Sequence, residues 1–248
     1  LGDVYKRQGQ KLCENVELAL ELDTPQLYEA WLREPMETFA EKYWKKWGLQ
    51  EHPIAKKPVE RVYIGNTFCP HLFPENDILH AMLEKAKIEG ISVTLTFSWI
   101  KESQIDSIRE LLKFLEQRKE YMPNEIAVND WGTAHLIRKW KQETQNCVKL
   151  NPGILLNRYK KDNRSRYLKE ETKCFQETNL NSEFYQQYLK ENQIERYELE
   201  ACGHEIVIPK GKHSLHLPFF QTNTAQFCTL YAKCACGDLS LIHISEPT

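Results

Sequence analysis

Short apolar segments alternate with amphipathic segments along most of the chain, and this rhythm limits the possible fold more than any other feature. Residues 92–98 (SVTLTFS) are rich in β-branched residues and form the clearest predicted strand. Residues 105–115 then carry apolar side chains at helical spacing. Strands separated by helices imply parallel pairing, because a parallel partner requires a long crossover connection. The sequence therefore predicts an α/β fold.

The remaining predicted elements keep this order. We expect strands at 16–22, 61–65, 92–98, 125–128, 147–150, 196–201 and 213–217. We expect helices at 27–32, 35–47, 78–86, 105–115, 133–140 and 182–192. This succession favours a (βα) TIM-like barrel that is incomplete at its C-terminus over an open doubly wound sheet. We expect one domain over residues 9–236, with an N-terminal helical insertion near residues 35–58.

The two ends of the chain differ in character from the rest. Residues 1–8 (LGDVYKRQ) and 237–248 (GDLSLIHISEPT) are similar to translated sequencing adapters at the ends of metagenomic reading frames. We interpret both as adapter-derived tails and expect the natural protein to continue beyond them, as a fragment of a longer chain. Natural flexible tails are the alternative interpretation.

The charge balance and hydropathy exclude several classes of partner. A formal net charge of -2 provides no broad attraction for nucleic acid or anionic lipid. No apolar stretch approaches the roughly 20 residues of a membrane span, and the amino end lacks a secretory signal pattern. A cytoplasmic location is expected. In that reducing compartment the eight cysteines are better explained as core residues, reactive thiols or metal ligands than as disulfides.

Four cysteines are candidate metal ligands. Cys69 follows the predicted strand 61–65, whereas Cys228, Cys234 and Cys236 are crowded together in the spacing C-x5-C-x-C. Thiolates bind soft metals and iron-sulfur clusters. The spacing matches neither the ferredoxin pattern nor a paired zinc motif, so inert cysteines remain an equal alternative on the residues alone.

Three polar residues are candidate substrate-binding groups, because the carboxyl ends of parallel strands form the working face of a barrel. Asn129 and Asp130 follow the strand 125–128. Helix capping is the favoured interpretation for them, with Asp130 as a catalytic acid or base the alternative. His216 lies on the strand 213–217, where a hydrogen-bonded core histidine is favoured over a ligand contact. No catalytic residue is identified.

Four segments together resemble a known family. The resemblance is to the UbiU/UbiV group of the collagenase-like peptidase family, peptidases of unassigned catalytic type. The segments, in chain order, are VYIGNTFCPHLF, ILHAMLEKAKIEGISVTLTFSWI, EIAVNDWGTAHLIRK and HSLHLPFFQTNTAQFCTLYAKC. Together they cover about Arg61 to Cys236 and place Cys69 and Cys228 at two cluster-binding positions of the family.

The resemblance implies a barrel that carries a 4Fe-4S cluster on four cysteines and acts in oxygen-independent ubiquinone hydroxylation. It also implies a second family member as a heterodimer partner and a small-molecule, quinone-precursor substrate. Cys234 and Cys236 lie closer together than the remaining ligands of the family, and the chain before Arg61 departs from the family pattern. These departures favour a distinct subgroup. The alternatives are a collagenase-like peptidase, for which no nucleophile-base or metalloprotease motif is present, and a non-catalytic partner subunit.

Overall fold

The computed structural model describes residues 16–159, 176–194, 196–201, 206–219 and 221. The predicted tails 1–8 and 237–248 lie outside the described residues, as do Cys228, Cys234 and Cys236. The strands are β1 Ala19–Leu22, β2 Arg61–Gly65, β3 Ser92–Phe97, β4 Glu125–Val128, β5 Lys149–Pro152, β6 Arg196–Glu200 and β7 Lys212–His216. The helices are α1 Pro25–Arg33, α2 Met36–Lys46, α3 Asn76–Glu89, α4 Ile105–Glu116, α5 Trp131–Thr144 and α7 Glu183–Glu191.

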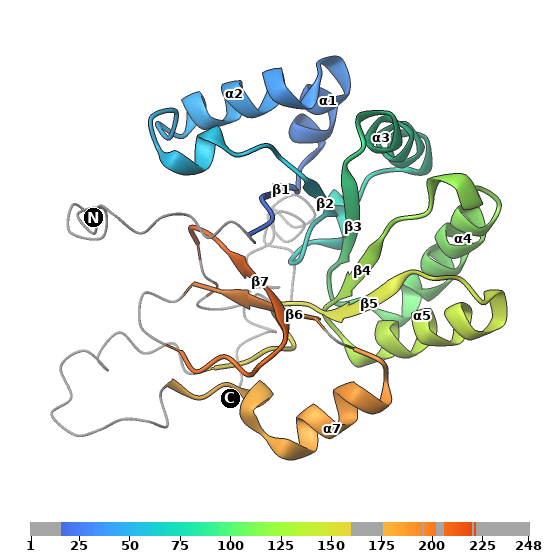
Figure 1. The fold of residues 1–248 in the computed structure, drawn as a ribbon. Coiled ribbons are helices and arrows are strands. Elements are labelled where there is room, and N and C mark those ends of the chain that lie inside the picture. Colours follow the sequence, from blue (N-terminus) through green and yellow to red (C-terminus); the bar gives the residue numbers. More distant parts are fainter. Residues whose placement is uncertain (1–15, 160–175, 195, 202–205, 220, 222–248) are drawn as a thin grey trace, which may run out of the picture.

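The first five strands form one parallel sheet in the order β1-β2-β3-β4-β5. A helix or helical pair follows each of β1 to β4, and Figure 1 shows α1 to α5 arrayed along the outer side of this sheet. The predicted α/β class is therefore confirmed. Strands β6 and β7 form a second parallel sheet of their own.

Alternation along each strand separates an apolar outer face from a polar inner face. Val62 and Ile64 belong to the hydrophobic core, which also contains Leu95, Ile126 and many helical side chains. Tyr63, between them in sequence, is also buried but is not part of that core. Successive side chains of a strand point to opposite faces, so Arg61, Tyr63 and their partners in register share the inner face. We use "inner face" for the side of the five-stranded sheet turned away from α1 to α5.

Side chains, rather than a backbone ladder, join the two sheets within the described residues. At one junction the Asn157 Nδ2 donates to the carbonyl oxygens of Pro152 (3.0 Å) and Glu198 (2.7 Å). At the other junction, His216 of β7 contacts Glu21 of β1. This arrangement is compatible with a TIM-like barrel, and the described strands contain no ladder that closes one.

Local chemistry explains the helix starts closest to the site. Pro25 occupies the first turn of α1, where its fixed φ and missing N–H cost nothing. Asp130 caps α5, because its Oδ1 accepts from the Thr133 backbone N–H at 2.7 Å. The region of the predicted insertion contains α2 and a short 3₁₀ helix, Pro53–Lys56.

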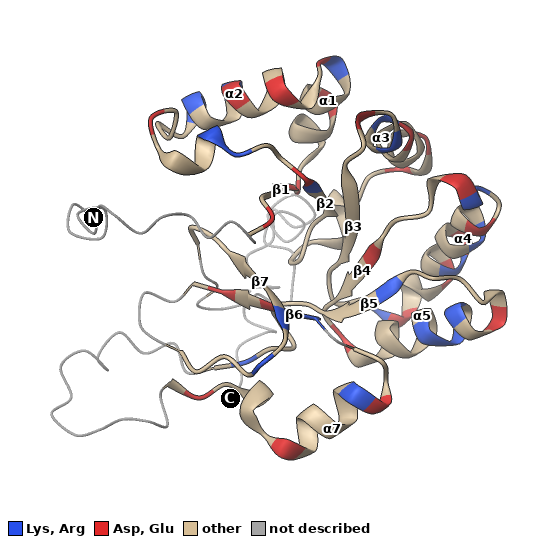
Figure 2. Cartoon of the chain, viewed as in Figure 1, with Lys and Arg blue, Asp and Glu red and all other residues tan. Residues whose placement is uncertain are grey.

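Charged side chains of both signs are interspersed along the outer helices (Figure 2). Most of these residues are exposed, as is usual for a solvated helix surface. Among the residues described, none of the helices combines the length and apolarity required to cross a bilayer.

Candidate functional site

The inner face carries a buried network of charges centred on Glu125. The Glu125 Oε2 accepts hydrogen bonds from Arg196 (2.7 Å), Asn151 (3.1 Å) and Thr94 (3.2 Å), and it lies 3.3 Å from an Arg61 nitrogen. Glu125 is 5% exposed and Arg61 8% exposed. Buried charges require partners of opposite sign, and each guanidinium here has one. The network thus ties β2, β3, β4, β5 and β6 together.

The network continues through Tyr63 to β6 and β7. The Tyr63 hydroxyl lies 3.0 Å from Glu198 Oε1 and 2.9 Å from the Ser214 hydroxyl, and it also contacts Arg196. Burial, and then the negative charge of Glu198, raise the pKa of Tyr63 well above its ordinary value. Tyr63 therefore stays a neutral hydroxyl at any physiological pH. It connects the two sheets by side-chain hydrogen bonds alone.

His216 occupies the carboxyl end of β7 between two carboxylates. Its Nδ1 contacts Glu21 of β1 and its Nε2 contacts Glu198 of β6. Burial alone lowers the pKa of His216, but hydrogen bonds to Glu198 and Glu21 outweigh it and raise the pKa to about 10. The side chain is therefore an imidazolium at neutral pH, which is the form that donates from both nitrogens. The favoured interpretation of His216 as a hydrogen-bonded histidine agrees with this geometry.

The raised pKa of His216 makes stability depend on pH. A histidine in the unfolded chain has a pKa near 6.5, so protonation stabilises the fold most below about pH 6.5. That contribution declines as the pH rises and is lost above about pH 10. We expect the difference in unfolding free energy between wild type and His216→Gln to shrink steadily over this range. Urea unfolding of both proteins between about pH 6 and pH 10.5 measures it. A constant difference would contradict the imidazolium assignment.

Cys69 lies in the loop that follows β2, at the carboxyl edge of the five-stranded sheet. Its thiol is free and the residue is partly buried. The Asn66 Oδ1 accepts from the backbone N–H groups of Phe68 and Cys69, both at 2.8 Å, while its Nδ2 donates to the Asp23 carbonyl at 3.1 Å. This brace fixes the start of the Cys69 loop against the end of β1. The predicted position of Cys69 at a strand end agrees with this geometry.

Asn129 and Asp130 hold backbone groups around the end of β4. The Asn129 Nδ2 donates to the Phe97 carbonyl at 2.7 Å, and its Oδ1 accepts from Leu155 N–H at 3.0 Å. The Asp130 carboxylate, besides capping α5, accepts from the Thr133 hydroxyl at 2.7 Å and from Ile100 N–H at 3.2 Å. Asp130 therefore caps α5 as predicted, whereas Asn129 does not cap a helix and instead joins the ends of β3 and β5 through backbone groups. Their contact with a substrate stays a prediction.

The structure brings His216 onto a network that sequence reasoning did not identify. The missed members are Glu21, Arg61, Tyr63, Glu125, Arg196 and Glu198. A signal for them existed, because RVYIG and EIAV each begin with a charged residue in an otherwise uncharged strand, and RYELE has charges at alternate positions. A charge at an inner position of a fully buried strand predicts a partner on a neighbouring strand. Which strand provides that partner depends on register.

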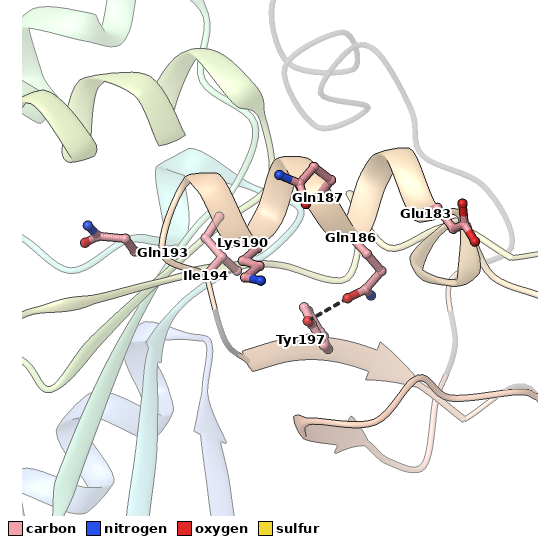
Figure 3. A pocket seen from close by; sticks show the side chains of 7 residues that line it. All are labelled: Glu183, Gln186, Gln187, Lys190, Gln193, Ile194 and Tyr197. Atoms are coloured by element: carbon pink, nitrogen blue, oxygen red, sulfur yellow. Dashed lines mark hydrogen bonds between the residues drawn. The ribbon is translucent and has the colours of Figure 1, made fainter.

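Two shallow depressions lie away from the carboxyl ends of the strands that carry this network. Figure 3 shows one of about 510 Å³ between α7 and β6, where the Tyr197 hydroxyl donates to Gln186 Oε1 at 3.2 Å. Its other lining residues are Glu183, Gln187, Lys190, Gln193 and Ile194. The second, of about 520 Å³, opens at the amino ends of the strands beside Arg61 and Glu125.

Comparison with known proteins assigns no family to the chain. No protein-family model matches it, and no curated protein does. Among solved structures, a U32 peptidase is similar with a TM-score of 0.40 and 10% sequence identity, over 77% of this chain and 61% of that chain. The chain therefore spans about three fifths of the length of that peptidase. At this level of likeness the neighbour assigns neither a family nor an activity.

Proposed function

We propose that this chain is an iron-sulfur protein of the (βα)-barrel type, with Cys69 as one cluster ligand. The supporting observation is the position of Cys69: a free, partly buried thiol at the carboxyl edge of a parallel sheet, in a loop braced by Asn66. Thiolates hold iron-sulfur clusters, and ligands on loops gain precision when a rigid scaffold positions them. The proposal assigns Cys228, Cys234 and Cys236 as the other three ligands.

The described residues fit such a cluster in one respect. They place one partly exposed thiol at the carboxyl edge of the sheet, and they contain no group of three or more His, Cys, Asp or Glu side chains that could hold a metal ion. The proposal therefore takes the remaining thiolates from outside the described residues. When bound, a 4Fe-4S cluster supplies one-electron chemistry.

Iron content tests the proposal directly. We expect the full chain, reconstituted anaerobically with iron and sulfide, to bind about four iron atoms and to show the absorbance and paramagnetic signals of a 4Fe-4S cluster. Cys69→Ser is expected to lose most of this iron, because a hydroxyl replaces the soft thiolate.

Cys147 provides the matched control, since it is also a free cysteine but lies exposed before β5, at the opposite edge of the sheet. Cys147→Ser should keep the iron of the wild type. Undiminished iron in Cys69→Ser, or equal losses in both variants, would refute the assignment of Cys69.

The proposal extends to an oxygen-independent hydroxylation of a small quinone precursor, carried out with a second family member as heterodimer partner. A polar substrate would suit the inner face, because imidazolium, carboxylate and hydroxyl groups meet there around His216 and Tyr63. His216 would hold its proton there, and Asn129 and Asp130 would shape the adjoining loops. Copurification of a second family member with the full chain tests the pairing.

A collagenase-like peptidase is the other candidate. Between described residues, no serine, threonine or cysteine is hydrogen-bonded to a histidine, and both nitrogens of His216 contact glutamates. Nucleophilic catalysis requires such a nucleophile-base contact. No observation on the described residues therefore favours this second function.

A further inference from the structure

The depression beside α7 follows one stripe of that helix, on the outside of the molecule (Figure 1). Glu183, Gln186, Gln187 and Lys190 line it at spacings of three and four residues, so they lie along one side of α7 (Figure 3). Glu183 and Lys190 occupy opposite ends of the stripe, two helical turns or about 10 Å apart. The stripe therefore has a negative end, a positive end and two amides between them.

The charges at the two ends of the stripe are unpaired in a single chain. Both side chains are exposed, and neither Glu183 nor Lys190 forms an ion pair with another described residue. On α5, by contrast, Lys139 lies 3.8 Å from Glu143, four residues further along the helix. Glu183 and Lys190 are too far apart along α7 for such a pair. A contact between this carboxylate and this ammonium therefore requires a second copy of the helix.

Two aromatic side chains flank the stripe. Phe184 is 82% exposed, the highest value among the large hydrophobic side chains of the described residues, and Tyr188 is 36% exposed one turn further along. The Tyr188 ring is held in place by Trp131, whose ring centroid lies 5.1 Å away. Large exposed apolar side chains that lie together mark interaction surfaces. The outer face of α7 thus combines an apolar flank with complementary charges.

We propose that α7 pairs with α7 of a second copy of this chain, antiparallel about a two-fold axis between Gln186 and Gln187. In a two-fold interface every contact occurs twice, because each residue of a contacting pair meets the other on both sides of the axis. Glu183 and Lys190 are equally far from this axis, so each Glu183 lies opposite Lys190 of the other copy. The same axis brings Phe184 close to Tyr188 of the other copy. Glutamine amides, which both donate and accept, meet at the axis.

The charges determine the antiparallel direction. Parallel pairing would place Glu183 against Glu183 and Lys190 against Lys190, and like charges repel. Antiparallel pairing also sets the positive amino end of one helix dipole beside the negative carboxyl end of the other. Glu191, which accepts from Gln187 Nε2 at 2.8 Å, would then lie near the amino end of the second α7, where a carboxylate is favoured. An interface one helix wide is small, so we expect a reversible dimer with a micromolar Kd.

Exchange of the two charges tests the pairing. Sedimentation velocity of the iron-free full chain should show a concentration-dependent shift from monomer to dimer. Lys190→Glu and Glu183→Lys are each expected to raise the Kd at least about tenfold, because each creates two like-charge contacts per dimer. The double variant, with both substitutions, restores opposite charges at exchanged positions. Its Kd should return to within about threefold of the wild-type value.

Matched controls separate this contact from a general effect of charge. Lys139→Glu and Glu143→Lys make the same changes at exposed positions of α5 and should dimerise as the wild type does. A chain that stays monomeric at millimolar concentration would overturn the proposal and leave this face of α7 to a different protein. Single variants that dimerise like the controls, or a double variant that dimerises no better than the single variants, would also overturn it. With neither iron nor a second family member present, the result is independent of the proposed function.

Discussion

Glu125→Ala is expected to lower the unfolding free energy by about 3–5 kcal/mol. The substitution removes the carboxylate that Arg61 and Arg196 share and leaves both guanidinium groups buried with fewer acceptors. Glu17 still contacts Arg61 and Glu198 still lies near Arg196, which keeps the loss finite. Chemical denaturation of the two proteins at neutral pH measures the difference.

Two further variants separate charge from packing at this position. Glu125→Gln keeps the side-chain shape and one acceptor oxygen, so we expect it to be destabilised less than Glu125→Ala but clearly below the wild type. Glu110→Ala, on the exposed surface of α4, is the control and should change stability by no more than about 0.5 kcal/mol. If Glu125→Ala behaved like this control, the buried network would contribute nothing to stability.

Gly65→Ala is expected to destabilise the protein by about 3 kcal/mol or more. Gly65 ends β2 with a φ of +112°, which L-residues rarely adopt. A Cβ there would lie 2.3 Å from the Thr96 carbonyl oxygen and 2.9 Å from the Phe73 ring, and the carbonyl cannot move without disturbing β3. The measurement is again the unfolding free energy from denaturant titration.

Gly48→Ala distinguishes backbone strain from this steric clash. Gly48 also has a positive φ, +65°, but a Cβ there would have no neighbour within 4 Å. Its substitution should cost only about 1–2 kcal/mol, the value for a left-handed conformation alone. Equal losses at the two glycines would show that the close approach to Thr96 and Phe73 is relieved by small shifts.

The order and type of the main elements could be predicted from the sequence because each has a strong local signal. Strands β2 and β4 have the predicted limits, since both are short apolar segments with clear breaks on either side. The limits of β5 differ: residues 147–150 were predicted, and Lys149–Pro152 form the strand. The shift follows from pairing with β4, which places Pro152 opposite Val128, a long-range constraint that local pattern does not contain.

The candidate site was predictable only in part. Cys69 and Asp130 lie where a strand ends and a helix begins, and such positions can be inferred from local sequence. The contacts of Glu125 with Arg196 and of Glu21 with His216 join residues 71 and 195 positions apart. They depend on which strands face one another, and local periodicity provides no information about that.

The side-chain junction between β7 and β1 has a consequence for the separation of the two sheets. Within the five-stranded sheet, the separation of two neighbouring strands would break a continuous ladder of backbone hydrogen bonds. Between β7 and β1, the described contact is the imidazolium of His216 with Glu21, whose carboxylate is half exposed to water. Water molecules can hydrogen-bond to the His216 and Glu21 side chains in place of this contact, and the backbone hydrogen bonds of both sheets are then kept. Within the described residues, this is therefore one of the two junctions at which the sheets can separate without the loss of a strand ladder, the other being that of Asn157.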